Sequence, residues 1–320
     1  MMKKFNVLVV GAGRIGAFFD SPSSKQIITH AHAARKHKNF NLIGFVDKDK
    51  ESLNKAMQLW NCNGFLTIED AFRCLDNKID VVCVATPDNL HFETIRRVSA
   101  FTVKLIFTEK PLASNIEEAQ NIIKISKSKK IPIAVNYSRR FVDEITQIEK
   151  EIKNGDYGAY LSGTGYYGKG LLHNGSHMID LLRMLLGEIR HCENYGIIND
   201  HKKTDPSVSI RVNFYNKKSF FLNAVSCKKF TIFEADFIFE RARIRIIDSG
   251  FRIEKYFVRN DKMFEGYKKL ILEEKVNSSL ELAMYNAFDN IANFLIKGEP
   301  LKCSMEEGYK TVKIVSDIQI

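Results

Sequence analysis

The stretch that decides the fold is Phe5-Asn6-Val7-Leu8-Val9-Val10-Gly11-Ala12-Gly13-Arg14-Ile15-Gly16. Its first half is a short, nearly continuous apolar run, which is typical of a strand buried on both faces of a sheet. Its second half is a G-x-G-x-x-G turn that we expect to open a helix. There Gly11 permits a tight turn, Gly13 lets a pyrophosphate approach the backbone, and Gly16 allows close helix–strand packing.

Helix N–H groups at such a turn face the phosphates of a dinucleotide. The alternative is a glycine-rich turn that binds nothing. We assign the following residues of the turn to cofactor binding: Gly11, Gly13, Arg14, Ile15 and Gly16.

Four more apolar runs follow, with helical patterns between them: 42–46, 81–85, 103–107 and 131–135. Strands that alternate with helices of this length predict a parallel α/β sheet. Right-handed crossovers make it a doubly wound, Rossmann-type sheet with its crevice at the carboxyl ends of the strands. Asp47 ends the second run and suits the ribose hydroxyls of NAD. The 2′-phosphate of NADP favours a basic residue there, and Lys48 is only adjacent, so we predict NAD over NADP.

The spacing between the glycine turn and the acid is unusual. Asp47 lies 31 residues after Gly16, whereas the fingerprint places the acid about 20 residues on. We therefore interpret residues 20–25 as an insertion before the true crossover helix, expected over 29–38. This insertion either lies above the crevice, where it touches a ligand, or is a solvated surface loop.

Further polar segments complete the pattern: 85–91 (ATPDNLH), 109–111 (EKP), 136–141 (NYSRRF) and 170–180 (GLLHNGSHMID). In this order the set resembles the Gfo/Idh/MocA oxidoreductase family, and the resemblance covers nearly the whole chain. It implies a dinucleotide-binding domain joined to an α+β domain with a large, mainly antiparallel open sheet. It also implies an NAD(P)-dependent dehydrogenase or reductase acting on CH–OH groups.

Hydride transfer from a secondary alcohol requires a base near neutrality and a group that orients the oxygen. Histidine suits the first task, and a lysine ammonium can stabilise the developing alkoxide. By the resemblance, Lys110 contacts the substrate hydroxyl and the nicotinamide ribose, and His177 transfers the proton. The alternatives are a surface lysine and a core histidine. The resemblance also places these residues at the cofactor: Thr86, Pro87, His91, Glu109, Lys110 and Asn136.

One departure from the family concerns the substrate side. Many members carry an acid four residues before the histidine, where this chain has His173 followed by Asn174, without a replacing carboxylate in that loop. A less negative site suits an anionic or acetamido substrate. His173 either takes over proton transfer or marks a loss of catalysis. Arg139 and Arg140 suit a carboxylate or phosphate, although one of them could instead form an interdomain salt bridge. We predict all four as substrate-binding.

The predicted organisation is a dinucleotide-binding domain over 1–137 and a substrate-binding and oligomerisation domain over 138–320. The last helices, within 278–297 and 305–318, are expected to pack back on the first domain. One face of an antiparallel sheet has to be covered. In the family another subunit often covers it, so we expect a homodimer or homotetramer.

Composition excludes several classes of protein. The net charge is +10, but the lysines are scattered, and we find no recognition helix or aromatic–basic groove, so we expect no nucleic-acid partner. No apolar run approaches the roughly 18 residues of a membrane span. Six scattered cysteines without a Cys-x-x-Cys pair predict reduced thiols, a cytoplasmic protein and no metal site.

The predicted function is hydride transfer between NAD and the hydroxyl or keto carbon of a sugar derivative. A nucleotide-linked or anionic sugar in surface-polysaccharide biosynthesis is the preferred substrate. The alternatives are a dehydrogenase of a free sugar or an inositol-like cyclitol, and a catalytically silent, NAD-bound sugar sensor or scaffold.

Overall fold

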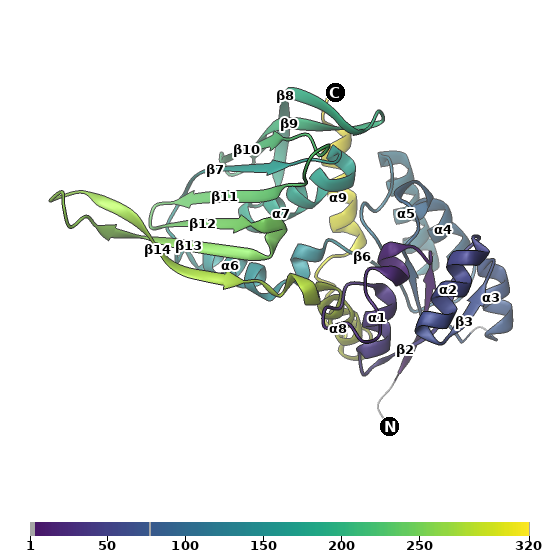
Figure 1. Ribbon diagram of the computed structural model, residues 1–320. Helices are drawn as coiled ribbons and strands as arrows, with labels where there is room; N and C mark the ends of the chain where they lie inside the picture. The colour runs from purple at the N-terminus through teal and green to yellow at the C-terminus, as the bar shows by residue number, and fades with distance from the viewer. Residues whose placement is uncertain (1–3, 77, 320) are drawn as a thin grey trace. The chain divides into compact units, whose positions relative to one another are not determined.

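The computed structural model describes residues 4–76 and 78–319 (Figure 1). The chain divides into two compact units. The first unit contains Met1–Phe141 and Glu281–Val312, and the second contains Val142–Leu280 and Lys313–Ile320. The first unit thus takes in a segment from far along the chain, which includes helix α8 (Ala283–Lys297).

The first unit is built on a six-stranded parallel sheet with the order β3-β2-β1-β4-β5-β6. Its strands are β1 (Phe5–Val10), β2 (Phe40–Val46), β3 (Asn63–Phe65), β4 (Val81–Val84), β5 (Leu105–Thr108) and β6 (Ile133–Val135). The doubly wound parallel sheet is therefore confirmed. Strand order reverses between β1 and β4, and ligands of such sheets bind at that reversal. The three-residue β3 was not predicted, because Asn63 and Gly64 disfavour a strand.

Five helices connect these strands: α1 (His30–Lys36), α2 (Lys50–Trp60), α3 (Ile68–Cys74), α4 (His91–Val98) and α5 (Ile116–Lys129). Four of them begin at a side chain that accepts a backbone N–H bond. Thr29 caps α1, Asp49 caps α2, Thr67 caps α3 and Asn115 caps α5. The crossover helix α1 therefore starts at the residue predicted for it.

The loop before α1 is fixed by one carboxylate. Asp20 accepts backbone N–H bonds from Ile28 (2.6 Å) and Thr29 (3.1 Å) and a bond from the Thr29 hydroxyl. Its Oδ2 also lies 2.9 Å from Nδ1 of the buried His32. The predicted insertion is thus tied to the start of α1.

The second unit is built on an eight-stranded sheet with the order β14-β13-β12-β11-β7-β10-β9-β8 (Figure 1). Its strands are β7 (Tyr160–Tyr167), β8 (Ile189–Lys202), β9 (Asp205–Phe214), β10 (Ser219–Ala224), β11 (Phe233–Phe239), β12 (Ala242–Ile247), β13 (Arg252–Asn260) and β14 (Lys268–Asn277). All neighbours are antiparallel except β7 and β10. The predicted large, mainly antiparallel open sheet is confirmed.

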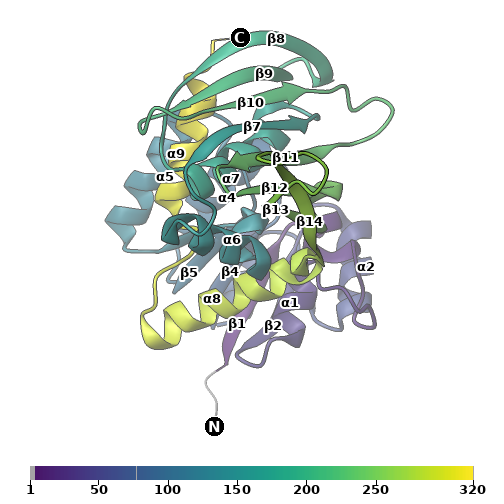
Figure 2. The same cartoon turned by 90° about the vertical axis from the view of Figure 1, so that its left-hand side faces the viewer.

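Helices α6 (Asp143–Asn154) and α7 (Ser176–Leu186) cover one face of this sheet (Figure 2). Strand β12 shows the two faces in its alternation, with Ala242, Ile244 and Ile246 buried and the arginines between them part-exposed. Helix α9 (Met305–Ser316) ends the described helices. Among the described residues, no helix is both long and apolar enough to cross a membrane.

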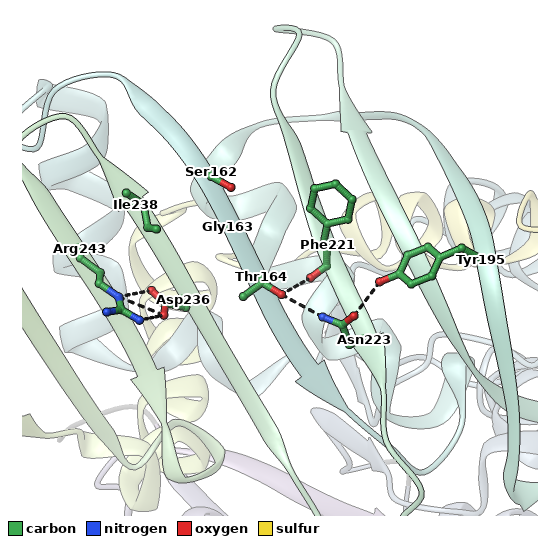
Figure 3. Close-up of a pocket in the computed structure, with 9 residues that line it drawn as sticks. All are labelled: Ser162, Gly163, Thr164, Tyr195, Phe221, Asn223, Asp236, Ile238 and Arg243. Atoms are coloured by element: carbon green, nitrogen blue, oxygen red, sulfur yellow. Dashed lines mark hydrogen bonds and ion pairs between the residues drawn. The ribbon is translucent and has the colours of Figure 1, made fainter.

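The other face of the sheet is open (Figure 3). It holds a hollow of about 540 Å³ lined by Ser162, Gly163, Thr164, Tyr195, Phe221, Asn223, Asp236, Ile238 and Arg243. Its polar side chains bond to one another: the Tyr195 hydroxyl donates to Asn223 Oδ1 (2.8 Å), and Asn223 Nδ2 donates to Thr164 Oγ1 (2.9 Å). Apolar side chains such as Phe221 remain 43% exposed between them.

Candidate active site

The glycine turn after β1 has the predicted steric character at two positions. Gly11 has φ +107°, and a Cβ there would lie 2.5 Å from the Ala85 carbonyl oxygen. A Cβ on Gly16 would clash with the carbonyl oxygen of Gly11. Gly13 differs, because a Cβ there would meet no atom within 4 Å. The protein itself does not need glycine at position 13, which suits a position kept clear for a ligand.

The turn does not open the expected α-helix. Residues Arg14–Phe18 form a single π-helical turn, and the α-helix follows only at His30. The insertion predicted from the spacing accounts for this difference, since it separates the glycine turn from the crossover helix.

Asp47 is held beside the glycine turn at the end of β2. Its Oδ2 accepts the Ala12 backbone N–H (2.7 Å), and its Oδ1 accepts that of Asp49 (3.0 Å). A carboxylate has about four acceptor positions, so each oxygen retains one. The carboxylate is thus oriented by the protein and still able to accept hydrogen bonds from a ribose.

A cavity of about 480 Å³ lies at the carboxyl ends of the strands of the first unit. Five of the predicted cofactor residues line it, namely Gly11, Gly13, Asp47, Thr86 and Pro87. Other residues of the wall were not predicted as site residues: Val10, Val46, Leu66, Thr67, Ile68, Ala85, Leu90, Glu93, Thr94 and Arg97. Lys48, considered only as a neighbour of Asp47, also lines it. Arg97 projects from α4 and pairs with Glu69. No sequence motif identifies Arg97 as a residue of the cavity wall, because its position depends on the packing of α4.

Glu109, at the end of β5, is the centre of a buried polar cluster. Its Oε1 accepts Nδ2 of Asn136 (2.7 Å) and lies 2.9 Å from Nε2 of His30. Burial opposes ionisation of Glu109, but the hydrogen bonds of His30 and Asn136 and the charge of Lys110 outweigh it. Its pKa therefore lies below the ordinary value. The predicted residues Glu109, Lys110 and Asn136 are brought together here, outside the wall of the cavity.

His30 was not predicted as a site residue. It is fully buried in α1, and its ring packs edge-on against Phe107 (5.0 Å between centroids) and Phe288 (6.4 Å). Its Nε2 faces the Glu109 carboxylate. The only sequence signal was a histidine in the first turn of the expected crossover helix.

His91 lies between two turns of the first unit. Its ring is fully buried, with Nδ1 2.7 Å from the Pro111 carbonyl oxygen and Nε2 3.0 Å from that of Thr86. It therefore ties the turn after β4 to the turn after β5. The peptide bond between Lys110 and Pro111 is cis.

The two arginines predicted for substrate lie in a short 3₁₀ turn, Ser138–Phe141. Arg140 donates to Glu307 Oε2 (3.0 Å) and to the Lys302 carbonyl (3.3 Å), both within the first unit. An interdomain salt bridge was the alternative to substrate binding for one of these arginines. Arg140 does form a salt bridge, but its partner Glu307 belongs to the same unit. Burial lowers the pKa of the Arg139 guanidinium.

His177 belongs to the second unit, whereas Lys110 belongs to the first. It lies in the first turn of α7, is 8% exposed, and its ring meets Phe233 edge-on at 6.4 Å. Just before α7, Asn174 donates its Nδ2 to the Gly168 carbonyl (2.8 Å).

A carboxylate from another element contacts the loop around His173. Asp205 of β9 accepts the backbone N–H groups of Leu172 (2.8 Å) and His173 (2.9 Å). The ring of His173 stacks on His201 of β8, with centroids 5.1 Å apart. Burial and the charge of His173 lower the pKa of His201. The prediction from sequence considered only the residues of the loop. It therefore missed Asp205 and His201, which belong to β9 and β8.

Among the described residues, the structure records no disulfide between cysteines. Among residues 4–76 and 78–319, no group of three or more His, Cys, Asp or Glu side chains is arranged to hold a metal ion.

The parallel sheet and the glycine turn of the first unit are those of a Rossmann-type dinucleotide-binding fold. Residues 5–137 match the GFO_IDH_MocA family model, described as "Oxidoreductase family, NAD-binding Rossmann fold". This match confirms the resemblance to the Gfo/Idh/MocA family over residues 5–137 and, at the level of the family, the expected NAD cofactor.

Two curated proteins and one solved structure illustrate the relationship. The chain is 30% identical to the rhizopine catabolism protein MocA of Rhizobium meliloti over 48% of this chain and 44% of that protein. It is 32% identical to inositol 2-dehydrogenase/D-chiro-inositol 3-dehydrogenase of Lacticaseibacillus casei over 38% and 35%. The WlbA dehydrogenase of Bordetella pertussis, solved with NADH and UDP-GlcNAcA, superposes with TM-score 0.76 at 18% identity, covering 99% and 95% of the two chains.

These matches differ in how much of each protein they cover. The chain spans less than half the length of each of these two curated relatives, and the structural likeness, at its low identity, concerns the fold. Both units have counterparts in the WlbA dehydrogenase, since nearly the whole chain is covered.

Proposed function

We propose that the protein is an NAD-dependent dehydrogenase or reductase that acts on a hydroxyl or keto carbon of a sugar derivative. One observation carries the proposal: the glycine turn, Asp47 and the Thr86-Pro87 segment line one cavity at the carboxyl ends of the parallel strands. Gly13 leaves room there for a ligand to approach the backbone, and Asp47 is oriented by Ala12. These residues fit the pyrophosphate and a ribose of NAD.

When bound, the nicotinamide accepts or returns the hydride. The chain's own residues handle the oxygen and its proton. Lys110 orients the substrate hydroxyl and stabilises negative charge on the oxygen as its proton leaves. His177 takes that proton during oxidation and returns it during reduction. The charge of Lys110 in turn helps to keep the Glu109 carboxylate ionised.

The proposed substrate is a nucleotide-linked or anionic sugar, within surface-polysaccharide biosynthesis. Arg139, His173 and the stacked His201 supply groups suited to a carboxylate or phosphate. The UDP-GlcNAcA bound in the structure of the WlbA dehydrogenase belongs to this chemical class.

Two alternatives have support of their own. The similarity to an inositol dehydrogenase favours a free sugar or cyclitol. The absence of an acid four residues before His177 favours a silent, NAD-bound sensor or scaffold.

NADH formation should be followed at 340 nm across a panel of nucleotide sugars, free sugars, inositols and their uronic acids. We expect turnover with an anionic nucleotide sugar. Turnover with inositols alone would establish the cyclitol dehydrogenase. Tight NAD binding without turnover on any member, in either direction, would establish the sensor.

A homodimer or homotetramer remains our proposal, as does a cytoplasmic location. Exposed Tyr166, Phe221 and Ile238 on the open sheet face support contact with a second subunit.

A further inference from the structure

Strand β14 (Lys268–Asn277) forms one edge of the eight-stranded sheet. In the part of the chain that the structure describes, it pairs with β13 alone. Figure 1 shows the hairpin of β13 and β14 reaching beyond the ends of β11 and β12. An exposed, apolar edge of this kind is a template for pairing with another strand.

Apolar residues are exposed at the centre of this edge. Leu270, Ile271 and Leu272 are 38%, 38% and 43% exposed. The tip of the same hairpin adds Met263, which is 79% exposed, and Tyr267, which is 71% exposed. A strand edge that faces only water does not require so many exposed apolar side chains. We therefore expect another strand to cover this edge.

The sequence of β14 indicates which strand would cover this edge. Residues 269–273 read Lys-Leu-Ile-Leu-Glu, and this pentapeptide is complementary to itself in the antiparallel direction. With a two-fold axis at Ile271, Lys269 lies opposite Glu273, and Leu270 lies opposite Leu272. Opposite charges in facing positions stabilise an antiparallel pair, and like charges destabilise it.

Neighbouring registers do not match in this way. A shift by one residue places Leu270 opposite Glu273 in one direction and Lys269 opposite Leu272 in the other. Only the register centred on Ile271 pairs every charge with its opposite and every apolar side chain with another. We propose that β14 pairs antiparallel with β14 of a second copy of this chain in that register, joining the two sheets edge to edge.

Two features limit the length of this ladder. Glu273 is a bulged residue, because Leu272 faces Tyr256 and Glu274 faces the adjacent Lys255 on β13. Bulges commonly end strand pairing, and this one lies at the end of the complementary stretch. The ladder is therefore confined to residues 269–273.

The charged ends also have partners within the chain. Arg259 lies 2.7 Å from Glu273, and Lys269 lies 3.4 Å from Asp261. Salt bridges with side chains this exposed contribute little, so they can be shared with or exchanged for contacts to a second strand.

Charge reversal tests the register. We expect Lys269→Glu to halve the mass of the assembly measured by light scattering at low salt, because two glutamates then face each other. Glu273→Lys should do the same. The double variant K269E/E273K should recover the wild-type mass, and so should an equimolar mixture of the two single variants. Lys275→Glu is the matched control, since it makes the same charge change outside the complementary stretch.

Cross-linking tests the axis. In a Cys74→Ser background, Ile271→Cys places two thiols opposite each other across the two-fold axis, within disulfide reach for facing residues. We expect a disulfide-linked dimer on mild oxidation and none from the parent. A monomeric wild type would overturn the proposal. An assembly insensitive to Lys269→Glu that gives no Ile271→Cys cross-link would also overturn it and assign the contact to another surface, such as the open sheet face.

Discussion

At the scale of single residues, Asp47 is the side chain that we expect to determine the preference between cofactors. We predict that Asp47→Ala weakens NADH binding more than NADPH binding. The carboxylate accepts from ribose hydroxyls in NADH but repels the 2′-phosphate of NADPH. Lys48→Ala, the neighbouring cavity residue, is expected to weaken NADPH more. Fluorescence titration with both cofactors measures this, and equal losses for Asp47→Ala would remove the predicted NAD preference.

Lys110 and His177 should each be needed for turnover. We predict that Lys110→Ala and His177→Ala lower kcat at least about a hundredfold, the usual contribution of a positioned acid or base. Lys104→Ala and His191→Ala make the same changes at exposed positions and should retain activity. Circular dichroism confirms folding, and near-normal turnover of either site variant would exclude that residue from the mechanism.

Glu109 links the site to pH-dependent stability. Its pKa is lowered in the folded protein, so its ionisation stabilises the fold above the unfolded carboxyl pKa of about 4.3. That contribution is lost as the pH falls through the lower, folded value. We predict that Glu109→Gln costs most stability at neutral pH and progressively less below pH ~4. Urea unfolding from pH 3 to 7 measures the difference, and a pH-independent cost would contradict the assignment.

At the scale of elements, Gly16 of the glycine turn serves packing, whereas we expect Gly13 to serve ligand binding. A Cβ at position 16 would clash with the Gly11 carbonyl, whereas one at position 13 would meet no protein atom within 4 Å. We predict that Gly16→Ala destabilises by roughly 1–3 kcal/mol, as overpacking does. Gly13→Ala should unfold at the wild-type temperature in the absence of ligand, yet it should bind NADH more weakly. Thermal unfolding with and without NADH checks both, and equal destabilisation would contradict this division.

At the scale of the whole molecule, the net charge of +10 is spread over exposed lysines and predicts no particular partner. Ligand-dependent stability is more informative, because only a ligand that prefers the folded state stabilises it, by about 2.7 kcal/mol at a hundred times its Kd. We predict that an anionic nucleotide sugar, added with NAD, raises the Tm by several degrees. The matching free sugar should raise it less. The reverse order would favour the cyclitol or free-sugar alternative.

Local pattern predicted much of the fold. The apolar run ending at Val10, the cap at Thr29 and the insertion between Gly16 and α1 all follow from neighbouring residues. The resemblance placed Glu109 and Asn136 in one site, and they share a hydrogen bond. His30 escaped notice because its partner is 79 residues away. The same holds for Asp205, which bonds to the loop of His173 from 32 residues away.

The sequence by itself determined the order of strands and helices, the glycine turn and the acid at the end of β2. These depend on short-range periodicity, backbone sterics and the composition of turns. Only the tertiary structure decided which side chains those elements support. It turned His91 toward two carbonyl groups, paired Arg140 with Glu307, and brought a carboxylate from β9 to the His173 loop. Buried polar groups must find hydrogen-bond partners wherever the fold places them, and those partners here lie far apart along the chain.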